Sequence, residues 1–181
     1  YGRDLFSRVL LGVRVSLSIG FMAVFISNLI GIILGLVSGY YGGHLDKIIL
    51  WIINVFWSIP TLLLVIALSL VLGKGFWQVY IAIGLSIWVD VARLVRGKVM
   101  SEKNKDYVFA SKVLGYGDFK ILLNNILPNI LPPILILSAA NFASSILLES
   151  GLSFLGIGSQ PPIPSWGYMI KENYQYIIFG N

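Results

Sequence analysis

The sequence has no cysteine and one histidine, His44. Without cysteine the chain forms no disulfide and has no thiolate chemistry. A lone histidine cannot make a metal site, which needs several converging ligands, and we expect His44 in a loop. A Ser-His-Asp set is excluded for the same reason, and carboxylates come close to each other only within loops. We therefore expect a protein that is not an enzyme and that holds no metal or cofactor.

Charged residues are also scarce. They make up 12% of the 181 residues, whereas 57% are hydrophobic. Soluble domains carry about 25% charged residues, and so few charges cannot cover the surface of a soluble fold. The net charge of +5 is compatible with nucleic acid. However, the charges cluster between long apolar runs, which is typical of membrane topology and not of phosphate binding. The sequence thus predicts a lipid bilayer as solvent and no nucleic acid.

Four apolar runs are long enough to cross a bilayer, which takes about 20 residues. They cover residues 15–39, 48–72, 76–95 and 130–148. Backbone groups in lipid must be hydrogen-bonded within their own segment, and the runs are too long for barrel strands and do not alternate. We expect residues 1–181 to form a single all-α integral membrane domain, a polytopic helical bundle. The start without Met and the loop-like end indicate a fragment.

Glycine and proline interrupt two of these runs. Gly31, Gly35 and Gly39 lie four residues apart on one helical face, which predicts close helix packing. Pro60 removes a backbone N–H inside the second run and should kink the helix there. The kink is either a hinge for gating or a static packing feature.

Two carboxylates lie inside or at the edge of the apolar runs. Asp90 comes three residues before Arg93 on the same helical face, which favours a local ion pair over a role in a transport pathway. Glu149 ends the fourth run. It either lines the external mouth, where it can meet a substrate amine, or ends a helix among lipid headgroups.

Positive charges concentrate between the third and fourth runs. The residues are Arg93, Arg96, Lys98, Lys103, Lys105, Lys112 and Lys120. Because positively charged loops stay in the cytoplasm, we expect the connection 98–128 to be cytoplasmic. The alternation of the runs then places the tail, residues 150–181, outside.

The strongest local pattern runs from Asp106 to Pro128. Four residues are spaced at i, i+3, i+4 and i+7, as on one face of a helix: Tyr107, Ala110, Ser111 and Leu114. Gly115 follows where a helix end favours positive φ. Asp118 can cap a second helix from Phe119, and Pro128 marks the boundary to the fourth run. A short surface helix of this kind suits a groove on another protein.

This loop resembles the cytoplasmic loop of binding-protein-dependent ABC importer permeases. The family pattern is Glu-Ala-Ala, then Gly four residues after the second Ala, with Ile-x-Leu-Pro-like residues further on. The matching positions are Ala110, Gly115, Ile126 and Pro128. Phe109 stands where the family has Glu, and Ser111 where it has the second Ala.

Three further stretches resemble the peptide and nickel branch of this family, and its C-type subunit in particular. They are Gly-Arg-Asp-Leu-Phe-Ser-Arg at 2–8, Ala-Arg-Leu-Val-Arg-Gly at 92–97, and the segment 152–167 from Leu-Ser-Phe-Leu-Gly to Ser-Trp-Gly. The resemblance covers nearly the whole chain. It implies the ABC-importer permease (MetI-like) fold, with four of six spans in this sequence.

The resemblance implies a role as a multi-pass permease subunit in the cell (inner) membrane. Its partners would be a second, B-type permease, two cytoplasmic ATP-binding subunits and an extracytoplasmic solute-binding protein. The loop helix, with Asp106, Tyr107, Ala110, Ser111, Leu114, Gly115 and Pro128, would dock on the ATPase and pass its motion to the spans. The chain itself lacks Gly-x-x-x-x-Gly-Lys-Ser/Thr, the phosphate-binding motif of many ATPases.

The implied substrates are di- or oligopeptides, with nickel, glutathione or another small solute as the alternative. A gradient-driven transporter or channel would need ionisable groups or unwound half-helices within the membrane. Asp90 is the only candidate for such a group. A membrane scaffold without transport is a third interpretation.

Overall fold

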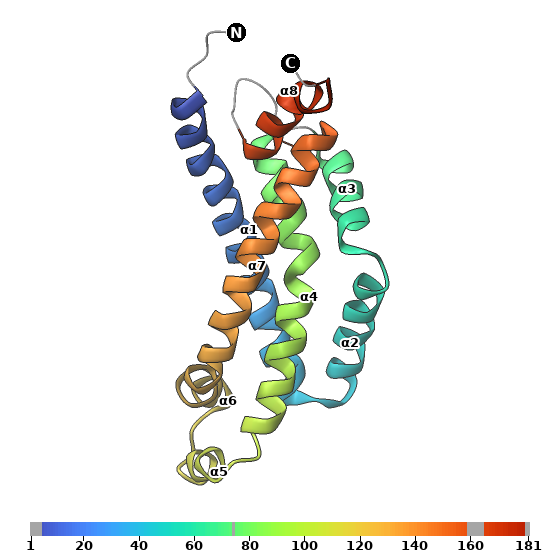
Figure 1. Cartoon of the computed structure of the whole chain (residues 1–181). Helices are drawn as coiled ribbons and strands as arrows, with labels where there is room; N and C mark the ends of the chain where they lie inside the picture. The colour runs from blue at the N-terminus through green and yellow to red at the C-terminus, as the bar shows by residue number, and fades with distance from the viewer. Residues whose placement is uncertain (1–4, 74, 159–164, 180–181) are drawn as a thin grey trace. The chain divides into compact units, whose positions relative to one another are not determined.

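The computed structural model describes residues 5–73, 75–158 and 165–179, without the side chains of residues 5 and 175–179. All regular secondary structure in these residues is helical, which confirms the predicted all-α class (Figure 1). The elements are α1 (Leu5–Tyr41), α2 (Gly43–Trp57), α3 (Thr61–Leu72), α4 (Phe76–Glu102), α5 (Asp106–Val113), α6 (Asp118–Lys120), the π-helix η1 (Ile121–Ile126), α7 (Leu127–Leu155) and α8 (Trp166–Phe179).

Three stretches of helix are long and apolar enough to cross a membrane, within the described residues. They are Phe6–Tyr41, Phe76–Glu102 and Asp118–Leu155, and α2 with α3 make a fourth if they form one broken span. The first, third and fourth apolar runs of the sequence lie within these stretches. The helices continue past the apolar runs into charged segments, because helical hydrogen bonding does not stop where hydrophobicity stops.

The second apolar run differs from the expected single kinked helix, because it is two helices. The backbone N–H of Ser58 donates to the carbonyl of Asn54 (3.0 Å) and closes α2. Pro60 has φ −54° and ψ 126° and stands immediately before α3. Proline disfavours helical geometry at the preceding residue and has no N–H for a helical bond. The chain therefore breaks at residues 58–60.

Pro128 lies inside a continuous helical stretch and is not the boundary predicted from the sequence. The π-helix η1 ends two residues before it, and the N–H of Leu127 donates to the carbonyl of Leu122, five residues back. Because Pro128 offers no N–H to the carbonyl four residues earlier, widening the turn there is less costly than in a regular helix. Pro132 and Pro133 follow within α7.

Two connections expected to be loops are largely helical. α2 begins at Gly43, so His44 lies in the first turn of a helix and not in a loop. The segment 150–181 contains the end of α7 and all of α8. Between these two helices, Gly156 has φ 81° and its N–H donates to the carbonyl of Ser153 (3.1 Å), so it ends α7 in a left-handed conformation.

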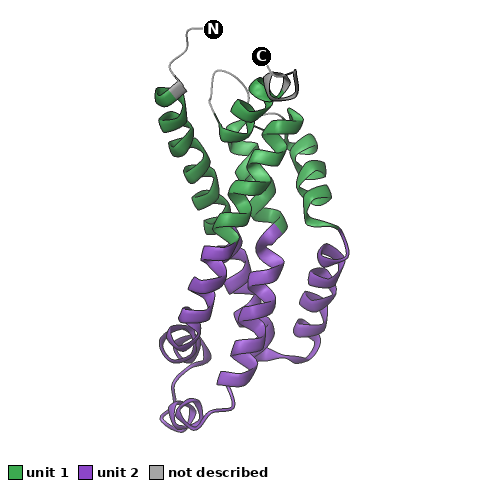
Figure 2. Ribbon diagram, in the orientation of Figure 1, with its two compact units in different colours: residues 1–26, 60–86, 141–181 green, residues 27–59, 87–140 purple. Residues whose placement is uncertain are grey.

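The chain divides into two compact units (Figure 2). Unit 1 comprises residues 1–26, 60–86 and 141–181, and unit 2 comprises residues 27–59 and 87–140. Helices α1, α4 and α7 each contribute residues to both units.

In unit 2 the glycine face of α1 packs directly on α4. A Cβ built on Gly31 would lie 2.6 Å from Cβ of Val91, and a Cβ on Gly35 would lie 2.6 Å from Cβ of Val95. Gly39 meets α4 one turn further on in the same way. The predicted close packing of the glycine face is therefore confirmed.

The remaining core of unit 2 forms two apolar clusters. One joins α1, α4 and α5 to η1 and α7 around Val95, Val108 and Ile126. The other joins α2 to α4, where Ile49 and Ile53 lie against Trp88 and its neighbours. The segment after α4 is thus held by buried side chains and is not a free loop.

Unit 1 is held by small-residue contacts and by polar pairs. Gly20 lies against the Phe142 ring, where a Cβ would come within 3.1 Å of it. The Arg8 guanidinium makes a 2.7 Å ion pair with Glu172, which joins α1 to α8. The Phe154 and Tyr174 rings meet edge to face with centroids 5.4 Å apart, which joins α8 to α7.

Replacing Gly35 by alanine is expected to destabilise the protein. The added Cβ would lie 2.8 Å from the carbonyl oxygen of Ala92 as well as against Val95, and a backbone atom cannot move aside cheaply. We expect a loss of about 1–3 kcal/mol, measured as thermal unfolding of the detergent-purified protein by circular dichroism. Gly97→Ala is the control, because a Cβ there meets nothing within 4 Å. Equal stability of the two variants would contradict this packing.

Candidate functional site

The segment after α4 forms a helix, a glycine turn and a second helix, as predicted. Helix α5 covers Asp106–Val113 and Leu114 caps its C-terminus. The N–H of Tyr116 reaches back to the carbonyl of Ser111 (3.1 Å), and Gly115 between them has φ 77°. This is the left-handed helix end that glycine allows at little cost. The turn fixes the direction in which the chain enters α6.

The four residues that the sequence places on one face of α5 are not all turned inward. Val108 and Ser111 are buried, Tyr107 is half-buried, and Ala110 and Leu114 are exposed. The amide of Asn125 on η1 donates to the Ser111 hydroxyl, which itself donates to the Tyr107 carbonyl (2.8 Å). The inward side of α5 is thus held both by the apolar contacts of Val108 and by polar bonding to η1.

The opposite side of this segment presents exposed apolar side chains, which we call the apolar knob. Its members are Phe109, Val113, Leu114, Tyr116 and Phe119. Val113 is 88% exposed, Phe119 75% and Leu114 72%. Clustered exposed apolar side chains mark interaction surfaces. Of these residues, sequence reasoning singled out only Leu114 for the site, although the apolar residues at 109, 113 and 119 are visible in the sequence.

Tyr107 anchors the knob to the end of α4. Its hydroxyl donates to the Glu102 carboxylate (2.6 Å), which also pairs with Lys105 (2.8 Å). Burial, and then the bond to Glu102, raise the pKa of Tyr107 to about 12. The phenol therefore stays protonated at physiological pH and keeps its role as donor.

Asp118 does not cap the second helix. The helix begins at Asp118 itself, after Gly117, and its N-terminus has no side-chain cap. The Asp118 carboxylate instead accepts a hydrogen bond from the Tyr40 hydroxyl (2.7 Å), which connects the end of α1 to α6. Sequence reasoning missed this contact because it joins residues 78 positions apart.

A second polar connection joins α2 to α4 in unit 2. Arg96 donates to both carboxylate oxygens of Asp46, at 2.6 and 2.8 Å, and Ser38 on α1 donates to the same carboxylate. The Lys103 ammonium caps the carbonyl of Gly39 (2.9 Å) at the end of α1. These contacts hold the ends of α1, α2 and α4 together beside the knob.

The favoured ion pair between Asp90 and Arg93 is not what unit 2 contains. The Trp57 indole N–H donates to Asp90 (3.2 Å), and Arg93 donates to the Asn54 side chain (2.9 Å). The Arg93 guanidinium lies 3.7 Å from the centroid of the Trp57 ring, a cation–π contact. Each charge thus has a polar partner on α2, because α2 approaches the same face of α4.

Glu149 lies in α7 and not at a helix end among headgroups. Its side chain is fully buried in unit 1 and accepts hydrogen bonds from Ser153 (2.7 Å) and Ser16 (3.4 Å). The contact with Ser16 joins α7 to α1. Neither position expected from the sequence, at a mouth or in headgroups, matches this burial.

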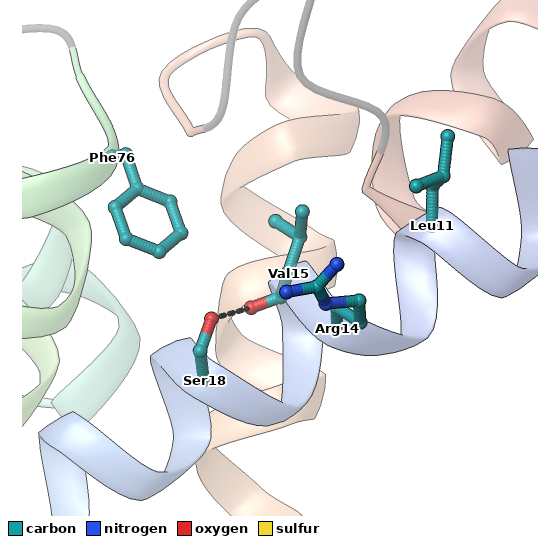
Figure 3. A pocket seen from close by; sticks show the side chains of 5 residues that line it. All are labelled: Leu11, Arg14, Val15, Ser18 and Phe76. Atoms are coloured by element: carbon teal, nitrogen blue, oxygen red, sulfur yellow. Dashed lines mark hydrogen bonds between the residues drawn. The ribbon is translucent and has the colours of Figure 1, made fainter.

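Unit 1 also contains a pocket of 390 Å³ against α1 and the start of α4 (Figure 3). Leu11, Arg14, Val15, Ser18 and Phe76 line it. The Ser18 hydroxyl donates to the Val15 carbonyl (2.8 Å) and is thus committed to the backbone. Arg14 is the last charged residue before the uncharged run of α1, where an arginine reaches the lipid–water interface.

In the part of the chain that the structure describes, no three His, Asp or Glu side chains come together to hold a metal ion. The features that stand out are the apolar knob and the polar groups around Asp90 and Glu149. Together with the long apolar helices, they define an integral, multi-pass membrane protein with a projection of exposed apolar side chains.

Comparison with known proteins identifies the family. Residues 31–180 match the family described as binding-protein-dependent transport system inner membrane component, and the chain belongs to it. The dipeptide transport system permease protein DppC of Bacillus subtilis (strain 168) is 43% identical over 180 residues, which are 99% of this chain. The oligopeptide permease protein OppC of the same organism is 40% identical over 178 residues, 98% of this chain.

A glutathione transport system permease protein, GsiD of Pectobacterium atrosepticum, is also 40% identical, over 94% of the chain. These alignments cover 56%, 58% and 57% of the three relatives, so the chain spans little more than half of their length. The resemblance to peptide-branch permeases is thereby confirmed.

The fold also matches a solved structure, the MetNI methionine ABC transporter in an inward-facing conformation. The TM-score is 0.80 at 18% identity, and the match covers 97% of this chain and 83% of the other. Identity this low supports the fold alone, and it confirms the predicted permease fold.

Replacing Asp46 by asparagine tests the connection between α2 and α4. The Arg96 side chain is only 21% exposed, and the variant leaves its charge without a counter-charge. Losing hydrogen bonds between charged groups should lower the free energy of unfolding by about 1–3 kcal/mol, measured by thermal unfolding in detergent. Asp106→Asn removes the same charge from an exposed position and should change stability by only a few tenths to about 1 kcal/mol. Equal losses in the two variants would refute the pairing.

Proposed function

We propose that this chain is the core of one permease subunit of a binding-protein-dependent ABC importer in the cell (inner) membrane. The observation that carries the proposal is the apolar knob. It lies at the junction of two membrane-length helical stretches, in a chain that belongs to this family. The knob, too small to fold alone, is held on the permease by buried contacts and presents apolar side chains to a partner.

The partner proposed for the knob is a cytoplasmic ATP-binding subunit, one of two in the complex. The seven Lys and Arg residues between positions 93 and 120 support a cytoplasmic location for the knob. A second, B-type permease and an extracytoplasmic solute-binding protein complete the assembly. The family's description as binding-protein-dependent supports the last of these partners.

Motion would pass from the knob to three helices of unit 2. Tyr107 bonds to Glu102 at the end of α4, Ser111 bonds to Asn125 in η1, and Asp118 bonds to Tyr40 at the end of α1. An ATPase that binds the knob differently in its open and closed states would therefore shift the equilibrium between two arrangements of the spans. In the same scheme, Pro60 at the break before α3 and Pro128 after the π-helix are proposed hinge points.

Glu149 is proposed as a gating residue within unit 1. Its bond to Ser16 joins α1 to α7, whereas its bond to Ser153 lies within α7. A movement of α1 against α7 would therefore have to break or reform the bond to Ser16. The cost of removing a partner from a buried carboxylate favours a discrete change over a gradual one.

The proposed substrates are di- or oligopeptides, because similar relatives are named dipeptide, oligopeptide and di/tripeptide permeases. The glutathione permease at 40% identity keeps glutathione as a related candidate. The deciding experiment reconstitutes the complete importer in vesicles and measures uptake of a labelled dipeptide with external binding protein and ATP. Glutathione and Ni²⁺ serve as competitors. ATP-dependent dipeptide uptake is expected; uptake driven by an ion gradient without ATP would replace the proposal with a secondary transporter.

Replacing Gly115 by valine should uncouple ATP hydrolysis from uptake. A β-branched residue at φ 77° costs about 1–2 kcal/mol locally, which redirects the knob without removing any of its side chains. We expect several-fold less dipeptide uptake per ATP hydrolysed in reconstituted vesicles. Gly117→Val is the matched control, because this neighbour has φ −68°, which valine adopts easily, and a Cβ added at either glycine meets nothing within 4 Å. If both variants couple normally, the turn has no role in transmission.

Replacing Leu114 by aspartate should detach the ATP-binding subunits. The side chain belongs to the apolar knob and is 72% exposed, and a charge there would be desolvated on docking without a partner. At least a tenfold loss of co-purifying ATP-binding subunit is expected. Asn104→Asp adds the same charge at an exposed position outside the knob and should leave the complex intact. Undiminished co-purification of Leu114→Asp would show that the ATPase binds elsewhere.

A further inference from the structure

A group of polar side chains in unit 2 lies far from the knob. It consists of Asn54 and Trp57 on α2 and Asp90 and Arg93 on α4, and we call it the charge pair station. Trp57 is 57% exposed, Asn54 is exposed, and the two charged residues are half-buried. The station therefore opens to the surface of the chain.

The station lies within the apolar run of a membrane-length helix. This run of α4 ends at residue 95, before the charged residues Arg96 and Lys98. At about 1.5 Å per residue, Asp90 lies about 8 Å inside the end of the run and Arg93 about 3 Å inside it. Charges at this depth face a protein interior or water and not lipid.

The backbone beside the station supports the same conclusion. Helix α2 ends at Trp57, and the exposed residues that follow are not helical. Unwound backbone at membrane depth is tolerated only where it is buried in protein or lines water. Since residues 57–59 are exposed in this chain, a water-filled path or another polypeptide has to cover them.

Only some of the hydrogen-bonding atoms of Asp90 and Arg93 have partners among the described residues. Oδ1 of Asp90 accepts from Trp57, and one Nη of Arg93 donates to Asn54. Among the described residues neither side chain forms an ion pair, and the second carboxylate oxygen and the other guanidinium nitrogens have no partner there. Stacking on Trp57 fixes the guanidinium plane. A carboxylate and a guanidinium held about one helical turn apart thus offer free hydrogen-bonding atoms of opposite charge.

We propose that the charge pair station binds the transported peptide in a water-filled pathway bordered by α2 and α4. The Asp90 carboxylate takes the peptide's free ammonium and the Arg93 guanidinium takes its carboxylate. A short peptide with both ends free is the dipolar solute that this arrangement complements, since guanidinium binds carboxylate in a planar, two-pronged way. The assignment rests on the peptide function proposed above.

The absence of cysteine from the sequence allows a direct test of access. In the reconstituted importer, Asn54→Cys should react with a membrane-impermeant sulfonate thiosulfonate reagent at least tenfold faster than Ile136→Cys. Ile136 is 74% exposed in the same unit and lies within an uncharged stretch of α7, so it serves as the lipid-facing control. Saturating alanyl-alanine, delivered by the binding protein, should slow the labelling of Asn54→Cys at least fivefold. Absence of labelling would mean that lipid or the second permease covers the station, and labelling that the dipeptide does not slow would mean that the peptide passes elsewhere; either overturns the proposal.

Uptake gives an independent readout. Arg93→Gln and Asp90→Asn should each lower alanyl-alanine uptake at least tenfold while ATP hydrolysis by the complex continues. Lys98→Gln, which also replaces a positive charge by glutamine but at an exposed position of α4, should leave uptake within twofold of the native importer. Normal uptake by both station variants would overturn the assignment, and if either fails to assemble, the labelling of Asn54→Cys still decides it. A native importer that takes up no dipeptide refutes the peptide function itself, whereas one that transports normally with an unlabelled or unprotected station refutes this inference alone.

Discussion

The close contact between α1 and α4 is the interaction on which unit 2 depends. Lipid tails are as apolar as the helices, so helices associate through tight packing rather than through the hydrophobic effect. Gly31 and Gly35 let the α1 backbone reach Val91, Val95 and the carbonyls beside them. Once α4 is fixed on α1, every polar contact farther along α4 is fixed too, because helical geometry sets the direction of each side chain.

The polar contacts along α4 are graded by depth. Near the centre of the helix, Asp90 and Arg93 are given neutral partners and an aromatic ring from α2. Closer to its end, Arg96 meets the carboxylate of Asp46 directly, and at its end Glu102 meets Tyr107. The ion pair thus lies closer to the end of α4, whereas Asp90 and Arg93 keep atoms available. Because a charge within a membrane span is costly, such atoms are retained only where they have a use or a polar cover.

Local chemistry made part of this structure predictable from the sequence. The long uncharged runs predict the membrane helices, and Gly115 predicts a left-handed turn because it follows a helical pattern. What the sequence did not predict was tertiary: Asn125 bonds to Ser111 on the inward side of α5, and Asp118 is taken by Tyr40 instead of capping its own helix. Asp90 likewise accepts its hydrogen bond from Trp57 on α2 and does not pair with Arg93 on its own helix. The spacing of residues along one helix cannot predict a partner on another helix.

The attachment of the apolar knob explains how a surface segment of so few residues can act on helices of membrane length. Tyr107 bonds to α4, the Ser111 hydroxyl to η1 and Asp118 to α1, so its three fastenings lie on three different elements. A segment held by one element would swing when pulled, whereas one held by three passes a load to all of them. Because the packed core beneath the knob is close to incompressible, force applied there displaces helices rather than deforming the attachment. The π-helix η1 contains Asn125, the partner of Ser111. Of the elements that hold the knob, its wider turn can change its hydrogen-bonding register at least cost.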